Sequence, residues 1–165
     1  MVWSDFVLKH SIWTNSETLT KKLNVFERLV DVFVIACTIG ISVDKRVEDD
    51  SNETITTIGR NTITQNSDLS RIFEFLYQNA ILSTNTVNFD GETRKKYAFD
   101  YNDNVPPISA NKLLLEFANY GMIQIVDAIS KDDLGTLDNI IELIDKYINN
   151  SLAFEIDDIE VEEII

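Results

Sequence analysis

The side chains of this protein that could do nucleophilic chemistry are those of one cysteine, Cys37, and one histidine, His10. A cysteine nucleophile needs a base within hydrogen-bonding distance and a further group that orients the base. Cys37 lies in the most hydrophobic stretch of the sequence, where burial raises the pKa of a thiol and leaves it inert. The sequence therefore favours a protein without catalytic residues. The alternative to that interpretation is an enzyme whose catalytic dyad is Cys37 and His10.

Metal and phosphate sites are no better supported by the residue types and their spacing. One cysteine and one histidine are too few soft ligands for a structural zinc site. The acidic run that begins at Asp100 lacks the glycine and the spacing of a calcium-binding loop, and the acids from Asp157 onward could hold Mg²⁺ only loosely. The five glycines are isolated, so neither a P-loop nor a dinucleotide-binding fingerprint can form. We expect no cofactor and no bound metal.

The charge of the chain restricts its partners. It carries 28 acidic and 14 basic side chains, a formal net charge of −14, and residues 101–165 hold 14 of the acids and three of the bases. Nucleic acids and anionic lipids attract basic faces, so we expect neither autonomous nucleic-acid binding nor membrane binding. The one basic cluster is Arg94, Lys95 and Lys96. It could contact a phosphate backbone inside a larger assembly, or it could be a solvated part of a loop.

The elements that must position these residues are predicted to be helices, because the chain has only five glycines and two prolines. Apolar residues recur at helical spacing over 16–23, 25–40, 67–82 and 109–130, and again from Thr136. The segment 25–40 is apolar on nearly all sides, which is typical of a central helix. Gly40 and Gly121 indicate a close helix approach or a break. Polar sequence predicts loops over 44–53 and 83–106.

We predict an all-α fold, a compact bundle of about four to five helices, in which residues 54–64 form either a minor β-hairpin or extended chain. A single helical domain is expected over 1–150, with an N-terminal arm over 1–15 and an acidic-hydrophobic tail over 151–165. The N-terminus lacks the pattern of a signal peptide and the single cysteine cannot form an internal disulfide, so we expect a cytoplasmic protein. The apolar side chains that could contact a partner, unless the domain buries them, are Trp3, Trp13, Ile159, Val161, Ile164 and Ile165.

Three segments resemble a family of small bacterial proteins known as DNA phosphorothioation-associated protein 4. They are the apolar run from Asp31 to Gly40, the stretch from Leu69 to Leu82, and residues 117–126 with the Leu137-Asp-Asn-Ile-Ile-Glu-Leu run that follows. The similarity covers roughly residues 20–150, although Tyr120 stands where the family commonly has glycine. The resemblance implies a helical fold and a role in anti-phage defence, and it supplies no catalytic residues.

The function that these observations favour is that of a non-catalytic accessory subunit of a bacterial antiviral defence complex, which acts through protein–protein contact. Its partner would be a larger protein of the same system, such as an ATPase or a nuclease. The alternative is an acidic inhibitor that imitates the charge of DNA and blocks a DNA-handling enzyme. Concentration of the acids in the last third of the chain weakens this alternative, because a mimic needs a broad acidic face.

Overall fold

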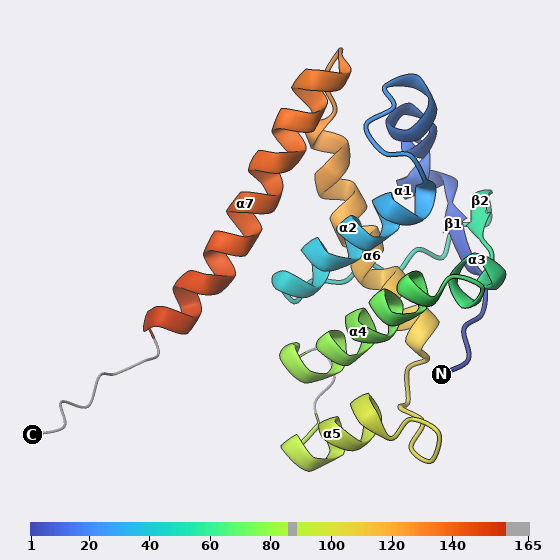
Figure 1. The fold of residues 1–165 in the computed structure, drawn as a ribbon, viewed down its shortest axis with the longest axis vertical. Helices are drawn as coiled ribbons and strands as arrows, with labels where there is room; N and C mark the ends of the chain where they lie inside the picture. The colour runs from blue at the N-terminus through green and yellow to red at the C-terminus, as the bar shows by residue number, and fades with distance from the viewer. Residues whose placement is uncertain (86–88, 158–165) are drawn as a thin grey trace, which may run out of the picture.

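The computed structural model describes residues 1–85 and 89–157, with side chains as far as Tyr147. Helices dominate this part of the chain, and a small two-stranded sheet accompanies them (Figure 1). The elements are, in order, β1 (Phe6–Lys9), α1 (His10–Trp13), the π-helical turn η1 (Thr18–Lys22), α2 (Leu29–Ser42), β2 (Thr54–Ile58), α3 (Arg60–Thr64), α4 (Ser67–Ser83), α5 (Gly91–Phe99), α6 (Ala110–Ala128) and α7 (Asp133–Asp157).

Helix α2 is the central element, as its sequence predicts. Residues on several of its sides are buried, among them Phe33, Cys37 and Ile39. The helix begins at Leu29, four residues later than the apolar pattern suggests. Asn24, five residues before Leu29, adopts a positive φ of 52°. Asparagine tolerates this left-handed conformation better than most residues do, so the chain turns there before the helix starts.

Two glycines bring α2 and α6 into backbone contact. A Cβ atom added at Gly40 would lie 2.2 Å from the carbonyl oxygen of Phe117, and one added at Gly121 would lie 1.8 Å from the carbonyl oxygen of Ala36. Each glycine therefore faces the backbone of the opposite helix, and no side chain fits between them. Both helices continue through their glycine, so the close approach predicted from the sequence is correct and the predicted break is not.

The N-terminal arm is part of a sheet, which corrects two of the predictions. Strand β1 pairs antiparallel with β2, with Phe6 opposite Ile58 and Leu8 opposite Thr56. Residues 54–64 therefore form no hairpin of their own. The predicted extended chain is correct for Thr54–Ile58, which pairs with the arm, and wrong for Arg60–Thr64, which form α3. The fold is mostly helical rather than all-α. Alternate residues of β1 point inward, so Phe6 and Leu8 are buried and hold the arm against the body.

Helix α5 lies where the sequence predicts a loop. Asp90 caps its first turn by accepting hydrogen bonds from the amides of Glu92 and Thr93. The helix presents few apolar residues, and it is held against α4 by polar contacts. The Tyr77 hydroxyl donates to the carbonyl of Tyr97 at 2.7 Å. This polar helix has no periodic apolar stripe, which is the signal used to predict the others.

Helix α7 leans away from the rest of the molecule. Figure 1 shows its first turns beside the end of α6 and its later turns diverging from the body. Within the described residues, no helix combines the length and the apolar character that a membrane crossing requires.

Candidate protein-interaction face on the last helix

The start of α7 is fixed by a hydrogen-bonded turn. The Ser130 amide donates to the Thr136 hydroxyl at 2.9 Å, and that hydroxyl donates to the carbonyl of Asp132 at 2.7 Å. The Asp132 carboxylate accepts from the Gly135 amide at 2.6 Å, as a helix-capping residue does. The helix therefore begins at Asp133, three residues before Thr136, where the apolar pattern starts, and Asp132 provides its cap. The turn sets the angle at which α7 leaves α6.

One face of α7 is held by the body of the protein. Ile140 and Tyr147 are buried, and Leu143 between them is half-buried. The amide of Asn139 donates to the carbonyl of Ala128 at 3.0 Å. The Tyr147 hydroxyl donates to Gln124 at 3.2 Å, and burial raises the pKa of Tyr147 to about 12. These contacts hold α7 in place along one side only.

A second apolar row on α7 is left uncovered. The exposed fractions are 70% for Leu134, 41% for Leu137 and 48% for Ile141. Their spacing of three and four residues places them on one side of a helix. In the sequence the same spacing continues with Ile144 and Ile148. We call Leu134, Leu137 and Ile141 the α7 apolar row.

An acidic row runs beside the apolar one. Asp138 and Glu142 directly follow Leu137 and Ile141 in the sequence, and Asp145 follows Ile144. One residue further along a helix is about 100° further around it. All three carboxylates are exposed. Residues 133–165 carry ten acidic side chains and one lysine, so this helix and the chain after it hold much of the net charge.

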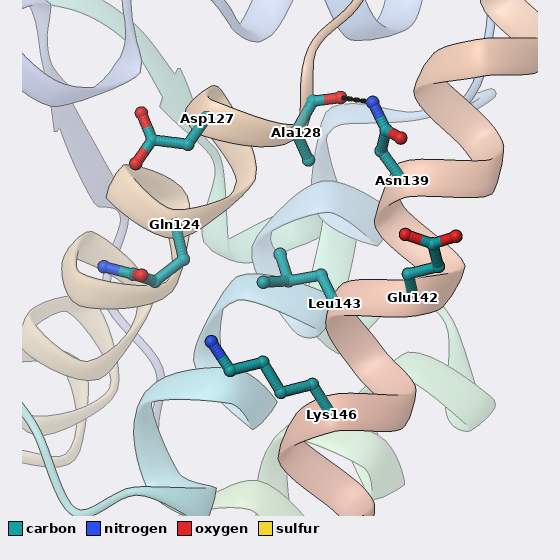
Figure 2. Close-up of a pocket in the computed structure, with 7 residues that line it drawn as sticks. All are labelled: Gln124, Asp127, Ala128, Asn139, Glu142, Leu143 and Lys146. Atoms are coloured by element: carbon teal, nitrogen blue, oxygen red, sulfur yellow. Dashed lines mark hydrogen bonds between the residues drawn. The ribbon is translucent and has the colours of Figure 1, made fainter.

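A cleft of about 570 Å³ lies between α6 and α7, where the two helices diverge (Figure 2). Leu143 points into the space between the helices, and Lys146 extends toward Gln124. Asp127 and Glu142 also line it, which gives the cleft mixed charge. The cleft is wide and open, and its polar groups do not converge on one position. It results from the divergence of α7 and lacks the features of a small-molecule site.

Trp3 and Trp13, two of the residues predicted to contact a partner, belong to the core. Both are buried, and the ring of Trp13 stacks on Phe33 with centroids 5.9 Å apart. Its indole nitrogen donates to Asn119 at 2.8 Å, and Asn119 donates in turn to the carbonyl of Val47 at 3.0 Å. Large aromatic side chains with a buried polar partner are ordinary packing. The structure therefore offers neither tryptophan to a partner.

The basic cluster is divided between two roles. The guanidinium of Arg94 donates to the carbonyl of Phe89 at 2.9 Å and to the carbonyls of Ile81 and Thr84, so it joins the end of α4 to α5. Lys95 and Lys96 are exposed on α5. The two lysines can still make the predicted phosphate contact. The guanidinium of Arg94 instead donates its hydrogen bonds within the protein.

Cys37 and His10 differ in their access to solvent. The Cys37 thiol is fully buried, donates to the carbonyl of Leu114 at 3.6 Å, and has a pKa that burial raises well above its ordinary value. His10 is exposed at the start of α1 and lies 3.4 Å from the Thr14 hydroxyl. The Cys37 thiol stays protonated and has no contact with solvent, so it is poorly suited to act as the nucleophile of a dyad with His10.

The remaining predicted contact residues lie outside the described part of the chain. They are Ile159, Val161, Ile164 and Ile165. The predicted tail boundary at residue 151 falls inside α7, which extends to Asp157. Among the described residues, no three His, Cys, Asp or Glu side chains come together as a metal site would require.

The sequence pattern does not mark the α7 apolar row as a surface, because Leu137 and Ile141 belong to the same apolar pattern as the buried Ile140. The signal that could have found it is the width of the apolar arc on α7. It reaches from Leu143 through Ile140 to Leu134, which is more than one neighbouring helix covers.

Comparison with protein-family models, with curated proteins and with solved structures found no match to this chain. The resemblance to the phosphorothioation-associated family therefore stays a prediction from the three segments that carry it.

Proposed function

We propose that this protein is a non-catalytic accessory subunit that binds a larger protein through α7. The observation that carries the proposal is the α7 apolar row, which is exposed on a helix held along one side only. Helices that present apolar residues at such spacing bind in apolar grooves of their partners. The fixed turn at Asp132 and Thr136 supports this role, because a helix that is already oriented loses less entropy on binding.

The charges beside the row define the partner more closely. Because Asp138, Glu142 and Asp145 flank the row, the complementary groove has basic side chains along that border. A second copy of this chain is a poor occupant, since it would bring two acidic rows together. The family resemblance supports the proposal that the complex acts in antiviral defence, with an ATPase or a nuclease as the larger component.

The test is to express the tagged protein together with the proteins encoded beside it, and to quantify by mass spectrometry what is recovered in fixed ratio. The recovered protein is then purified, and its affinity for variants of this chain is measured. Ile141→Glu should weaken binding by about 30-fold or more, the effect of losing an interface hot spot. Rising salt concentration should weaken the wild-type complex, because attraction between the acidic row and a basic border is screened.

Val105→Glu is the matched control, since Val105 is an exposed apolar residue in the loop between α5 and α6. It adds the same charge and should leave affinity unchanged. Equal affinity of Ile141→Glu and wild type would show that α7 is not the binding face. Recovery of this chain without a companion would contradict the accessory-subunit proposal. Direct inhibition of a DNA-handling enzyme by the isolated chain would then favour the DNA-mimic alternative.

A further inference from the structure

Helix α4 carries another uncovered apolar strip, beside its packed face. Phe75 has an exposed fraction of 66%, and Ile72 and Leu82 are also exposed. Asn79 lies between Phe75 and Leu82 in the same three-and-four spacing and is half-buried. We call Ile72, Phe75, Asn79 and Leu82 the α4 strip. The packed face of the same helix includes Phe73, Leu76 and Tyr77, which are buried.

The α4 strip lies in the part of the chain that carries no net charge. Residues 54–85, from β2 to the end of α4, hold two acidic and two basic side chains. The net charge of −14 therefore resides entirely in the other segments. Like charges oppose the approach of two copies of an acidic protein. Two copies that meet through α4 place neutral, apolar surfaces in contact, which limits this repulsion.

We propose that a second copy of this chain covers the α4 strip, in a symmetric dimer in which Asn79 faces Asn79 of the second copy. A twofold interface must be complementary to itself. An apolar strip meets this requirement, and so does an asparagine, because its amide both donates and accepts hydrogen bonds. A single asparagine within an apolar helical seam is a feature of paired helices, where it fixes their register.

The alternative occupant, the basic-bordered partner of α7, does not fit here. The charged side chains of α4 are Asp68, Arg71 and Glu74, which leave the helix a net charge of only −1, so it attracts a basic groove little. The dimer is independent of the proposed function. If both hold, each dimer presents two α7 helices, and binding to a partner with two such grooves gains from multivalency.

The test is the mass of the purified full-length protein in solution, measured by light scattering over a wide range of protein concentration. The wild type should rise from 18.9 kDa toward twice that mass. Added salt should favour the dimer, since it screens repulsion between the acidic segments. Phe75→Glu should remain monomeric throughout that range, and its circular dichroism should match the wild type because Phe75 makes little contact with the core. Val105→Glu should dimerise as the wild type does.

Oxidation of an engineered cysteine locates the contact. Cys37 is buried, so the thiol of Asn79→Cys is the accessible one and should form a disulfide between copies. Gln65→Cys, exposed at the turn before α4, should form far less. A wild-type mass of 18.9 kDa at every concentration would overturn the proposal, as would equal cross-linking at the two positions or a Phe75→Glu variant that still dimerises.

Discussion

The substitution Gly121→Ala tests the contact between α2 and α6 most directly. The added methyl group would lie 1.8 Å from the carbonyl oxygen of Ala36 and 2.5 Å from its carbonyl carbon. Ordinary contact begins near 3.4 Å, so the two helices must separate by about 1.5 Å at this point. Backbone atoms cannot rotate out of the way as a flexible side chain can.

The cost of this separation exceeds the gain in helix propensity. Alanine is about 1 kcal/mol more favourable than glycine within a helix. Overpacking a core costs about 1–3 kcal/mol, and more where backbone must move. A gap of even about 1 Å removes up to half of the dispersion energy of the atoms that line it, and the seam between α2 and α6 is buried along its length. We expect a net loss of at least about 2 kcal/mol in the free energy of unfolding.

Urea unfolding followed by circular dichroism measures this loss, and Gly91→Ala is the control. Gly91 opens α5 and has no atom within 4 Å of the added methyl group, so its replacement should be neutral or slightly stabilising. Gly40→Ala should resemble Gly121→Ala, and the double variant should lose less than the sum of the two, because one separation of the helices relieves both contacts. Equal stability of Gly121→Ala and Gly91→Ala would refute the reasoning.

Two further predictions concern buried polar groups. Asn119→Leu leaves the indole N–H of Trp13 and the carbonyl of Val47 without their partner. The free energy of unfolding, measured in urea, should therefore fall by about 2–4 kcal/mol. A loss below about 0.5 kcal/mol would show that water replaces the amide. Burial raises the pKa of Cys37 in the folded protein above its ordinary value of 9.0, so the unfolded chain loses this proton first as the pH rises. The contribution of the buried thiol to stability is therefore complete below pH 9.0 and declines above it, by up to about 1.4 kcal/mol per pH unit. Unfolding free energies measured across that range should decline less steeply in Cys37→Ala, and identical slopes would contradict the assignment.

The helices that the sequence predicts correctly are those with a continuous apolar stripe. Helix α4 matches its predicted range to one residue, and α6 (Ala110–Ala128) lies within the predicted range 109–130. The close approach at Gly40 and Gly121 is one of the two interpretations that the sequence allows, the other being a break in each helix. These features depend on residues near one another in the sequence.

The features that escape prediction depend on distant residues or on polar ones. The pairing of β1 with β2 joins segments about fifty residues apart, and neither strand alone indicates its partner. Helix α5 is signalled only by Asp90 as a capping residue and Glu92 in its first turn. The sequence alone does not show whether the tryptophans of the arm belong to the core or to an interface, because it does not give their burial. The α7 apolar row escapes prediction although its apolar signal is strong, because the sequence pattern of an exposed apolar residue is the same as that of a core residue.

The order of synthesis gives the α2–α6 contact a further consequence. Helix α2 ends at Ser42 and α6 begins at Ala110, so about 70 residues are translated between them, which takes roughly 4–14 s at cellular rates. During that interval the most apolar helix of the chain has no backbone partner for Gly40, and Trp13 has no amide to receive its N–H. The surface of α2 that packs on α6 in the folded protein therefore lacks this partner until α6 leaves the ribosome.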